Sequence, residues 1–172
     1  AAAPAPPAPG LSGAPGPGTP GPGAANPGAQ AAFEQVQELR TFVAQNPNNA
    51  DAVRQLANLN FDISNWSRAV ELYEQYLTLR PGDPNVLTDL GVALKSMNRF
   101  DEALEKLQAA RTADPTHWQA RYNEVIVLAF DLDRLDEAAA RTDELVQIAP
   151  DNPTVQRLAD EIALRQRGLP GS

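Results

Sequence analysis

The sequence contains no cysteine and only one histidine, His117, among its 172 residues. Without cysteine the chain has no disulfide framework, no thiolate metal site and no cysteine nucleophile. Metal sites usually need several His or Cys ligands or clustered carboxylates, and a catalytic triad would rest on this one imidazole. We therefore expect no metal, no cofactor and no enzymatic activity. We interpret His117 and Trp118 as residues that shape the start of a helix.

Long apolar runs and glycine-rich phosphate loops are also missing. No apolar run approaches the roughly 18 residues that a membrane-spanning helix requires. The glycines near the N-terminus precede no predicted strand, unlike those of a phosphate-binding loop. The formal net charge is -8, whereas Lys and Arg dominate surfaces that bind nucleic acid or anionic lipid. The expected partner is therefore another protein, with no nucleic acid and no direct membrane insertion by this chain.

Residues 1–30 lack both charge and aromatic side chains and consist almost wholly of Ala, Pro and Gly. Such a segment cannot bury enough apolar surface to offset the entropy lost on ordering, so it is predicted to be a flexible or polyproline-II tether. Its glycines do not keep a period of three, which excludes a collagen helix. The chain does not begin with Met, which is typical of a processed or truncated product.

What the sequence does contain is one phrase written three times. It reads NWSRAVEL from Asn65, NRFDEALEKL from Asn98 and DRLDEAAA from Asp133. An alanine in each copy and a proline after it are spaced 34 and then 35 residues apart: Ala69, Ala103 and Ala138; Pro81, Pro115 and Pro150. A second periodic segment precedes each copy. An internal period near 34 residues is typical of a solenoid built from helix-turn-helix units.

The periodic residues match the pattern of the tetratricopeptide repeat family, which runs large-x-x-Leu-small-x-x-Tyr, then Ala-x-x-x-Phe, then Pro. Copy by copy, the matching residues are Val53, Leu56, Ala57, Asn60, Ala69, Tyr73 and Pro81; Leu87, Leu90, Gly91, Leu94, Ala103, Leu107 and Pro115; Tyr122, Val125, Ile126, Ala129, Ala138, Thr142 and Pro150. The chain therefore resembles this family over about residues 31–167. The resemblance implies an all-α fold, a right-handed superhelical α-solenoid of antiparallel helix pairs.

The predicted organisation has a tether (1–30), an N-terminal half-repeat helix (31–47), three repeats (50–83, 84–117 and 118–152), a C-terminal capping helix (153–167) and a short tail (168–172). The extra residue of the third repeat is expected between Pro115 and Tyr122. In that repeat Ile126 takes the small-residue position and Thr142 the large one, a swap that would preserve volume.

Each repeated residue type has a physical reason. Small residues such as Gly91 and Ala103 are expected where two helices cross closely. Ser64, Asn98 and Asp133 stand at turns where Asn and Asp tolerate left-handed backbone angles. Prolines end each repeat, and Pro84 and Pro153 suit the first turn of the next helix. Carboxylates early in the second helices, such as Asp101 and Glu102, complement the helix dipole rather than form a catalytic pair.

The resemblance implies that the first helix of each pair lines a concave groove, the usual working surface of the family. Projecting the helical period predicts these groove-facing residues: Asp51, Arg54, Asn58, Phe61 and Asp62; Asn85, Thr88, Val92, Lys95 and Ser96; Ala120, Asn123, Val127, Phe130 and Asp131. Four apolar side chains among amides and both charges suit an extended or helical segment of a partner. The sequence therefore predicts a protein-interaction module: a scaffold, adaptor or assembly factor.

Chaperone-binding members of the family hold a partner's C-terminal carboxylates with a cluster of basic and amide residues. Arg54 and Asn58 match the first-repeat members of that clamp. The next amide position falls on Asp89, and the third-repeat basic pair falls on Ala120 and Glu124. Two carboxylates placed there would meet acid rather than base, which argues against a clamp.

Three alternatives remain at this point. The array could be a self-associating structural element, of the membrane-tethered envelope type, in which other partners are incidental. Residues 3–9, APAPPAP, could dock on Phe61 or Phe130 of the same or a neighbouring molecule, or the tether could be a plain linker.

A tether before such repeats resembles bacterial envelope proteins held off a membrane anchor, so the periplasm or cell envelope is favoured over the cytoplasm, where adaptors also use tethers. The partner and its motif are not predicted.

Overall fold

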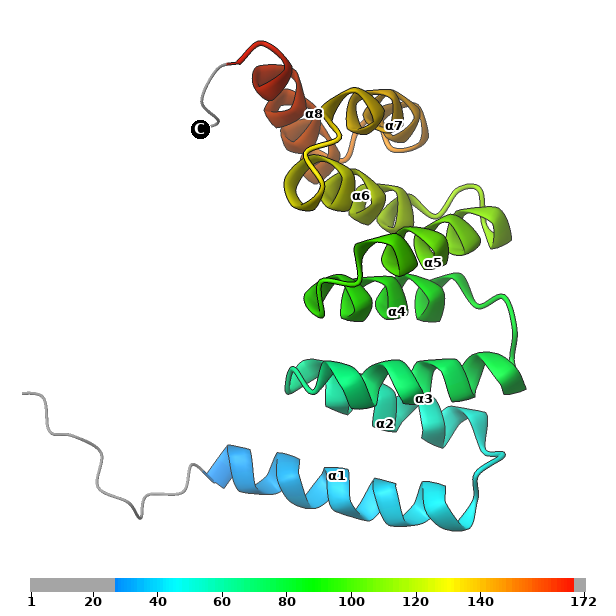
Figure 1. The fold of residues 1–172 in the computed structure, drawn as a ribbon. Coiled ribbons are helices and arrows are strands. Elements are labelled where there is room, and N and C mark those ends of the chain that lie inside the picture. The colour runs from blue at the N-terminus through cyan, green and yellow to red at the C-terminus, as the bar shows by residue number, and fades with distance from the viewer. Residues whose placement is uncertain (1–26, 169–172) are drawn as a thin grey trace, which may run out of the picture.

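The computed structural model describes residues 27–168, which form eight α-helices and one π-helix and no strand. The helices stack side by side along one direction (Figure 1). Their bounds are α1 (Pro27–Gln45), α2 (Ala50–Asp62), α3 (Trp66–Leu79), α4 (Pro84–Ser96), α5 (Phe100–Ala113), α6 (Trp118–Ile126), η1 (Val127–Asp131), α7 (Leu135–Ile148) and α8 (Pro153–Gln166). Helices α2/α3, α4/α5 and α6-η1/α7 are the three predicted pairs, and the all-α solenoid is confirmed.

The ends of the helices follow from local chemistry. Helices α2, α4 and α8 begin after Asn49, Asp83 and Asn152, whose side chains accept hydrogen bonds from backbone amides two or three residues on. These bonds satisfy donors that have no partner inside the helix. Pro84 and Pro153 stand in the first turn of their helices, as predicted, because the missing amide proton is not needed there.

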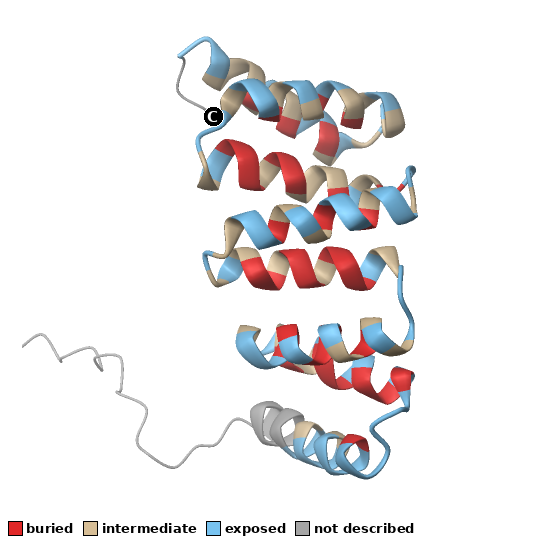
Figure 2. Ribbon diagram, turned by 45° about the vertical axis from the view of Figure 1, so that its right-hand side comes forward, coloured by how far each residue is buried: buried red, intermediate tan, exposed pale blue. Residues whose placement is uncertain are grey.

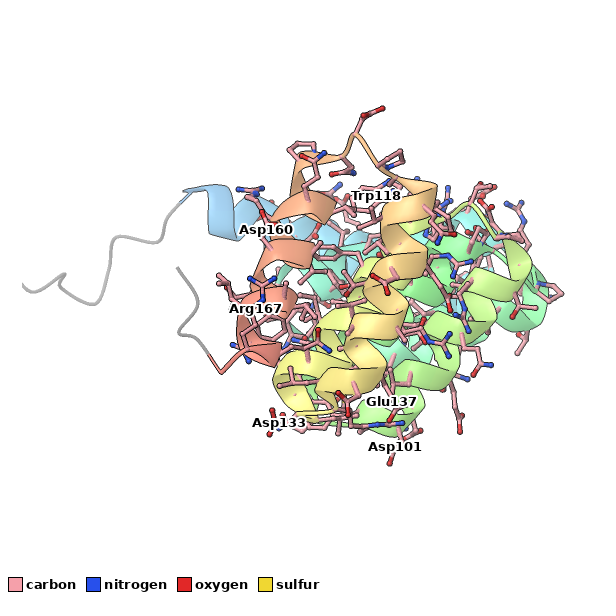
Figure 3. The ribbon with its side chains drawn as sticks, turned by 90° about the horizontal axis from the view of Figure 1, so that it is seen from above. Asp101, Trp118, Asp133, Glu137, Asp160 and Arg167 are labelled. Atoms are coloured by element: carbon pink, nitrogen blue, oxygen red, sulfur yellow. The ribbon has the colours of Figure 1, made fainter. Side chains whose placement is uncertain are left out.

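The turn inside each pair uses a left-handed residue. Ser64, Asn98 and Asp133 have φ angles of 59°, 58° and 53°, which confirms the role predicted for these positions. Trp66, Phe100 and Leu135 each begin the second helix two residues later. Figure 3 looks along the stack, with Asp133 at one end of α6-η1 and Trp118 at the other. The three turns therefore reverse the chain by the same local geometry.

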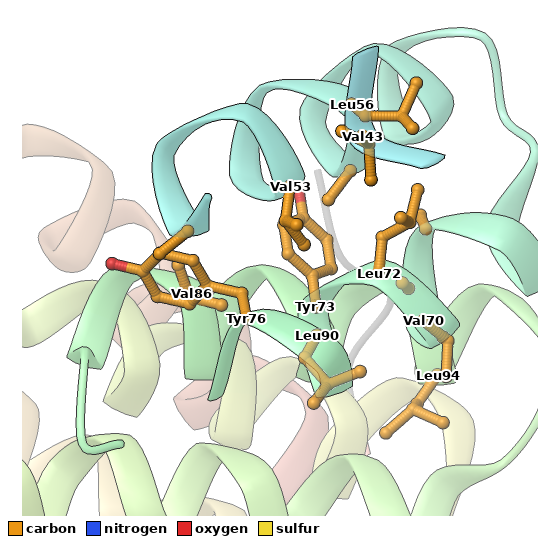
Figure 4. Packing of buried hydrophobic residues seen from close by; sticks show 14 of the residues in the cluster. Val43, Val53, Leu56, Val70, Leu72, Tyr73, Tyr76, Val86, Leu90 and Leu94 are labelled. Carbon is orange, nitrogen blue, oxygen red and sulfur yellow. The ribbon is translucent and has the colours of Figure 1, made fainter. Parts of the chain in front are cut away.

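Close packing within a pair depends on small residues, as the sequence predicts. A Cβ atom on Gly91 would lie 2.8 Å from Cγ of Leu107 and 3.3 Å from the carbonyl oxygen of Ala103. The apolar side chains form successive clusters along the stack, the first of which extends from Val43 to Ala103. Figure 4 shows its central members, and Figure 2 shows that buried residues follow the stack from repeat to repeat. Each repeat thus shares its core with its neighbours.

The third repeat places its extra residue where the sequence did not reveal it. First helices begin at Ala50, Pro84 and Trp118, in equal steps of 34, whereas the left-handed residues Ser64, Asn98 and Asp133 are 34 and 35 apart. The additional residue therefore lies within the helix, where η1 widens one turn. The expected insertion around residues 116–118 is wrong, because a π turn holds an extra residue without interrupting the helix.

This shift also changes one expected packing position. Ala57 and Gly91 are the eighth residues of α2 and α4, and the eighth residue of α6 is Val125 rather than Ile126. Val125 is completely buried, while Ile126 is half-buried. Thr142 is buried as well, in the position that Leu107 takes in the second repeat. The predicted swap of bulk therefore involves Val125 in place of Ile126.

The N-terminal helix begins earlier than expected. Helix α1 starts at Pro27, so residues 27–30 are helical and do not belong to the tether that the sequence predicts. A proline suits a first helical turn, and the Ala and Gln residues that follow are good helix formers. The rest of the tether prediction concerns residues 1–26, which lie outside the described residues, as do residues 169–172. None of the helices described is both long and apolar enough to span a membrane.

Candidate functional site

The first helices present most of the predicted groove residues to solvent, though not all of them. Seven are exposed: Asp51, Arg54, Asn58, Asp62, Asn85, Ser96 and Phe130. Five are half-buried: Phe61, Val92, Lys95, Asn123 and Asp131. Two are buried: Thr88 and Val127. The first two groups come from α2, α4 and α6-η1 alike. A surface made by the first helices of all three pairs is therefore present.

Thr88 and Val127 are corrections to the predicted surface. Thr88 is 5% exposed because its hydroxyl donates to the carbonyl of Pro84 and lies 3.1 Å from Nε2 of His117, at the start of the next pair. Val127 is fully buried because the extra residue of the third repeat comes after it, so Val127 takes the position of Ala93, which is also fully buried. Ala120, which was also assigned to the groove, is fully buried. None of the three can meet a partner.

Two tyrosines of α3 connect the surfaces of α2 and α4. The Tyr73 hydroxyl donates to Oδ1 of Asn58 at 3.0 Å, and the Tyr76 hydroxyl donates to Oδ2 of Asp83 at 2.8 Å. The guanidinium of Arg54 lies 5.9 Å from the centre of the Tyr76 ring, a cation–π distance. These contacts orient Arg54 and Asn58 on the same side of the stack.

Three carboxylates face one another beside these tyrosines. Burial, followed by the negative charges of Asp83 and Asp62, raises the pKa of Asp89 to about 6. Burial, followed by the charges of Asp89 and Asp62, also raises the pKa of the Tyr73 hydroxyl. Asp62, Asp83 and Asp89 therefore share one negative field. The projection omitted Asp89, although it follows Asn85 by four residues and precedes Val92 by three, and so lies on the same helix face.

The same side of the stack continues into the third repeat and the capping helix. The Lys95 ammonium lies 3.4 Å from Oδ2 of Asp131, which joins α4 to η1. The Arg165 guanidinium lies 4.1 Å from the centre of the Phe130 ring, which joins η1 to α8. We use the name first-helix surface for the residues that these contacts place together, with Asn123 included because it lies 34 residues after Asp89: Arg54, Asn58, Asp62, Asp89, Lys95, Asn123, Phe130 and Asp131.

Some predicted residues are occupied by contacts within the chain. Asp51 accepts two hydrogen bonds from Arg80, at 2.8 and 3.3 Å, at the C-terminus of α3. Phe61 packs edge-to-face on Trp66 with ring centres 5.0 Å apart. The amide of Asn123 and the hydroxyl of Ser96 each donate to a carbonyl oxygen four residues earlier. Asn123 keeps its amide oxygen as an acceptor.

The position of the π turn changes the comparison with the chaperone clamp. Because the first helices repeat every 34 residues before η1, the two third-repeat clamp positions fall on Gln119 and Asn123, and not on Ala120 and Glu124. Gln119 is exposed and Asn123 half-buried, whereas Ala120 and Glu124 are buried. The surface therefore presents amides at the positions where the clamp has cations, and Asp89 where it has an amide.

Glu124 is the most buried member of an ion network that joins α5, α6 and α7. Its carboxylate lies 3.2 Å from Arg141 and 3.7 Å from Arg111, and Glu144 lies 3.0 Å from Arg121 and 3.3 Å from Arg111. Burial raises the pKa of Glu124 despite the opposing effect of these arginines. The network connects the second repeat to the third and leaves Glu124 no access to a partner.

The side-chain groups on the first-helix surface are suited to binding another molecule. His117 is buried at the N-terminal end of α6 beside Thr88, the structural position that the sequence predicts for it. Within residues 27–168 no three His, Cys, Asp or Glu side chains are placed to hold a metal ion. The surface offers amides, carboxylates, a guanidinium and one exposed phenylalanine, groups suited to holding a peptide.

Comparison with known proteins agrees with the repeat geometry. Two family models, both described as tetratricopeptide repeat, match this chain, one at residues 26–84 and the other at residues 64–120 and 94–162. Over 85 residues, 47% of this chain, the sequence is 33% identical to the protein O-mannosyl-transferase TMTC1 of Mus musculus. That match spans only 9% of the mouse protein's length.

Solved structures share the fold at low sequence identity. The crystal structure of MamA is 18% identical, with a TM-score of 0.71, and the match covers 83% of this chain and 85% of that one. The first tetratricopeptide domain of Spaghetti (RPAP3), bound to the HSP90 peptide SRMEEVD, is also 18% identical, with a TM-score of 0.63. That match covers 69% of this chain and 95% of the other. These likenesses show the fold and no more.

Proposed function

The chain belongs to the tetratricopeptide repeat family, and we propose that it is a protein-interaction module that holds an extended or helical segment of a partner along its first-helix surface. Such a module acts as a scaffold, adaptor or assembly factor, since it brings together proteins rather than transforming a substrate. The amides of Asn58, Gln119 and Asn123 would bind the partner's main chain, and Phe130 would contact an apolar side chain.

The observation that carries the proposal is the continuity of this surface across four helices. Asn58 is held by Tyr73, Asp62 and Asp89 share one field, Lys95 reaches Asp131, and Phe130 lies under Arg165. Side chains held in place by the scaffold lose little entropy when a partner binds. An extended segment of a partner could therefore lie along the surface from α2 to α8 and meet side chains that the scaffold holds in place.

The chemistry of the surface favours a partner different from the HSP90 peptide in the Spaghetti structure. That peptide, SRMEEVD, is acidic at its C-terminal end, whereas this surface has two carboxylates beside Tyr73, those of Asp62 and Asp89, and an amide in the third repeat. Placing like charges opposite each other across an interface costs several kcal/mol of binding free energy, which disfavours an acidic partner. We expect a partner segment with a Lys or Arg side chain opposite Asp62 and Asp89 and with no requirement for a free C-terminus.

Affinity capture with a surface variant tests this proposal. The protein with Arg54→Ala, Asn58→Ala and Asn123→Ala is compared with one carrying Glu105→Ala, Gln108→Ala and Thr112→Ala, three exposed positions on α5. Both are immobilised, exposed to extract from the native source, and their bound proteins are quantified by mass spectrometry. The first variant should lose a partner that the second retains, while circular dichroism shows equal helicity. Equal capture by both variants would remove the first-helix surface from the function.

A further inference from the structure

A cavity of about 530 Å³ opens between α1, α2 and the start of α3, and it shares no residue with the first-helix surface. Three apolar side chains, Val36, Leu56 and Ile63, form its walls. Ile63 is 54% exposed and is one of three large apolar side chains that are exposed among the described residues. The volume lies in the range of small-ligand sites, about 300–1,000 Å³, and exceeds what one side chain fills.

The cavity exists because two positions of the repeat carry shorter side chains here. Asn60 stands where the second repeat has Leu94, and Asn65 stands where the second and third repeats have Arg99 and Arg134. Leu94 is buried in the core, whereas Asn60 turns back to donate to the carbonyl of Leu56 at 2.7 Å. Asn65 then donates to Oδ1 of Asn60 at 2.9 Å. These two hydrogen bonds hold both amides against α2, and the space beside them stays open.

The charge at this place is reversed relative to the next repeat. The cavity is lined by Gln37, Arg40 and Arg68, whereas the residues 34 positions later are Glu71, Glu74 and Glu102. In the second repeat Arg99 donates a hydrogen bond to Glu102, so the charge of this carboxylate is balanced within the chain. In the cavity, Arg68 pairs with Glu71 on the exposed surface, and Arg40 forms no ion pair within residues 27–168. Exposed pairs of this kind contribute little and exchange readily.

We propose that this cavity is a second binding site, which takes a partner segment with an aliphatic side chain next to one or two carboxylates. The aliphatic group enters between Val36, Leu56 and Ile63, and the carboxylates meet Arg40 and Arg68 at the rim. Guanidinium groups suit this role because their donors match carboxylate geometry. The site does not depend on the first-helix surface, so either one can fail alone.

Charge separates this occupant from the chain's own N-terminal segment. Residues 1–33 contain no charged side chain, and so they offer nothing to Arg40 and Arg68. A peptide from a partner protein fits both the apolar walls and the cationic rim, and the amide of Gln37 can bind its main chain. A second copy of this acidic chain is the competing source of carboxylates, and the experiment below separates the two.

The test uses NMR signals from isoleucine methyl groups. The chain has four isoleucines, Ile63, Ile126, Ile148 and Ile162, and only Ile63 lines the cavity. The probe is acetyl-Gly-Glu-Leu-Glu-Leu-Gly-amide, titrated to about 5 mM, which covers the weak end of specific binding. On addition of this peptide, the methyl signal of Ile63 should shift and those of the other three isoleucines should not. The same peptide with Gln in place of Glu should bind about tenfold more weakly, because it lacks the charge-assisted bonds.

Two variants check the assignment. Asn60→Leu restores the residue type of the second repeat, narrows the cavity beside Leu56 and should weaken the Ile63 shift, while Asn85→Leu, which adds the same side chain on α4, should not. Arg40→Glu with Arg68→Glu, at exposed positions that leave folding intact, should transfer the preference to a peptide with Lys in place of Glu. No Ile63 shift with the acidic peptide, or an unchanged shift in either cavity variant, overturns the proposal. An Ile63 shift that follows protein concentration without peptide assigns the cavity to a second copy and also overturns it.

Discussion

The carboxylate of Asp131 lies 3.4 Å from the ammonium of Lys95, across the boundary between the second and third repeats. Asp131 is the last residue of the π turn, so the extra residue of the third repeat determines where this carboxylate lies. The contact shows how a local irregularity of one helix alters the surface that three helices share. The following predictions concern that surface and the packing that supports it.

Replacement of Asp89 by asparagine should stabilise the protein at neutral pH. The folded-state pKa of Asp89, about 6, exceeds its ordinary value of 3.8, so the folded state binds the proton more tightly than the unfolded state does. Stability therefore falls as the pH rises from about 4 to about 6 and stays low above that. With allowance for solvent screening of a half-buried group, Asp89→Asn should raise the free energy of unfolding by about 1–2 kcal/mol at pH 7.

Urea unfolding of Asp89→Asn and the parent between pH 4 and pH 8 measures this effect. The difference between the two proteins should be small at pH 4 and should grow to its full size by pH 7. Asp151→Asn, at an exposed position between α7 and α8, is the matched control and should behave as the parent does. A difference that is independent of pH would show that the carboxylate charge is not the cause.

The left-handed turn at Ser64 is the least suited of the three to its backbone angle. Ser64 has a φ of 59°, where Asn98 and Asp133 stand in the other repeats, and serine has a lower tolerance for this region than asparagine. Ser64→Asn should raise the free energy of unfolding by about 0.5–1 kcal/mol. Ser67→Asn, inside the first turn of α3, should give no gain. Thermal unfolding of the two variants decides the matter, and equal midpoints would contradict the strain.

The buried ion network should contribute far more than the exposed ion pairs. Removal of the Glu124 carboxylate leaves Arg111 and Arg141 paired with Glu144 alone, so Glu124→Ala should cost about 2 kcal/mol, less than for a buried charge left without any partner. Glu137→Ala removes an exposed pair with Arg134 and should cost at most about 0.5 kcal/mol. Chemical denaturation at pH 7 provides both values. Similar losses in the two variants would mean that the network holds the repeats together no better than a surface pair does.

At the crossing of α4 and α5, a larger side chain on one helix should cost stability, and a smaller side chain on the other helix should restore part of it. A valine at Gly91 would place its Cβ 2.8 Å from Leu107, and we expect Gly91→Val to cost about 3 kcal/mol. The third repeat has Val125 opposite Thr142 at the corresponding positions. Adding Leu107→Thr should therefore recover part of the loss, and denaturation of the single and double variants measures the coupling. Additive losses would contradict a direct contact between the two positions.

The repeat geometry could be predicted because its determinants are local and recur. Prolines, left-handed residues and small residues at fixed spacings each act within one turn or one crossing, and Ser64, Gly91 and Pro84 all behave as the sequence indicates. The start of α1 at Pro27 was obscured because alanine and glycine also dominate the preceding residues. Composition alone does not separate an alanine-rich helix from a linker.

The surface was harder to predict, because exposure depends on neighbours that are distant in sequence. Thr88 is covered by His117 from the next repeat, and Val127 takes the core position of Ala93 because the extra residue of the third repeat comes after it. An ideal helical projection contains neither effect. Asp89 lies within that projection, but its shifted pKa depends on Asp83 and Asp62, and Asp62 is brought near through the packing of α3 against both α2 and α4.

Site-specific photo-crosslinking tests most directly whether the first-helix surface binds a partner. A photoreactive amino acid is introduced at Asn58 and at Asn123 on the first-helix surface, and, for comparison, at Gln108 and Thr112 on the opposite helix α5. After illumination in native extract, the crosslinked peptides are identified by mass spectrometry. We expect one protein to be linked at both surface positions through a single short segment, and not at the α5 positions. Crosslinks concentrated on α5, or different proteins at Asn58 and Asn123, would contradict a segment held along this surface.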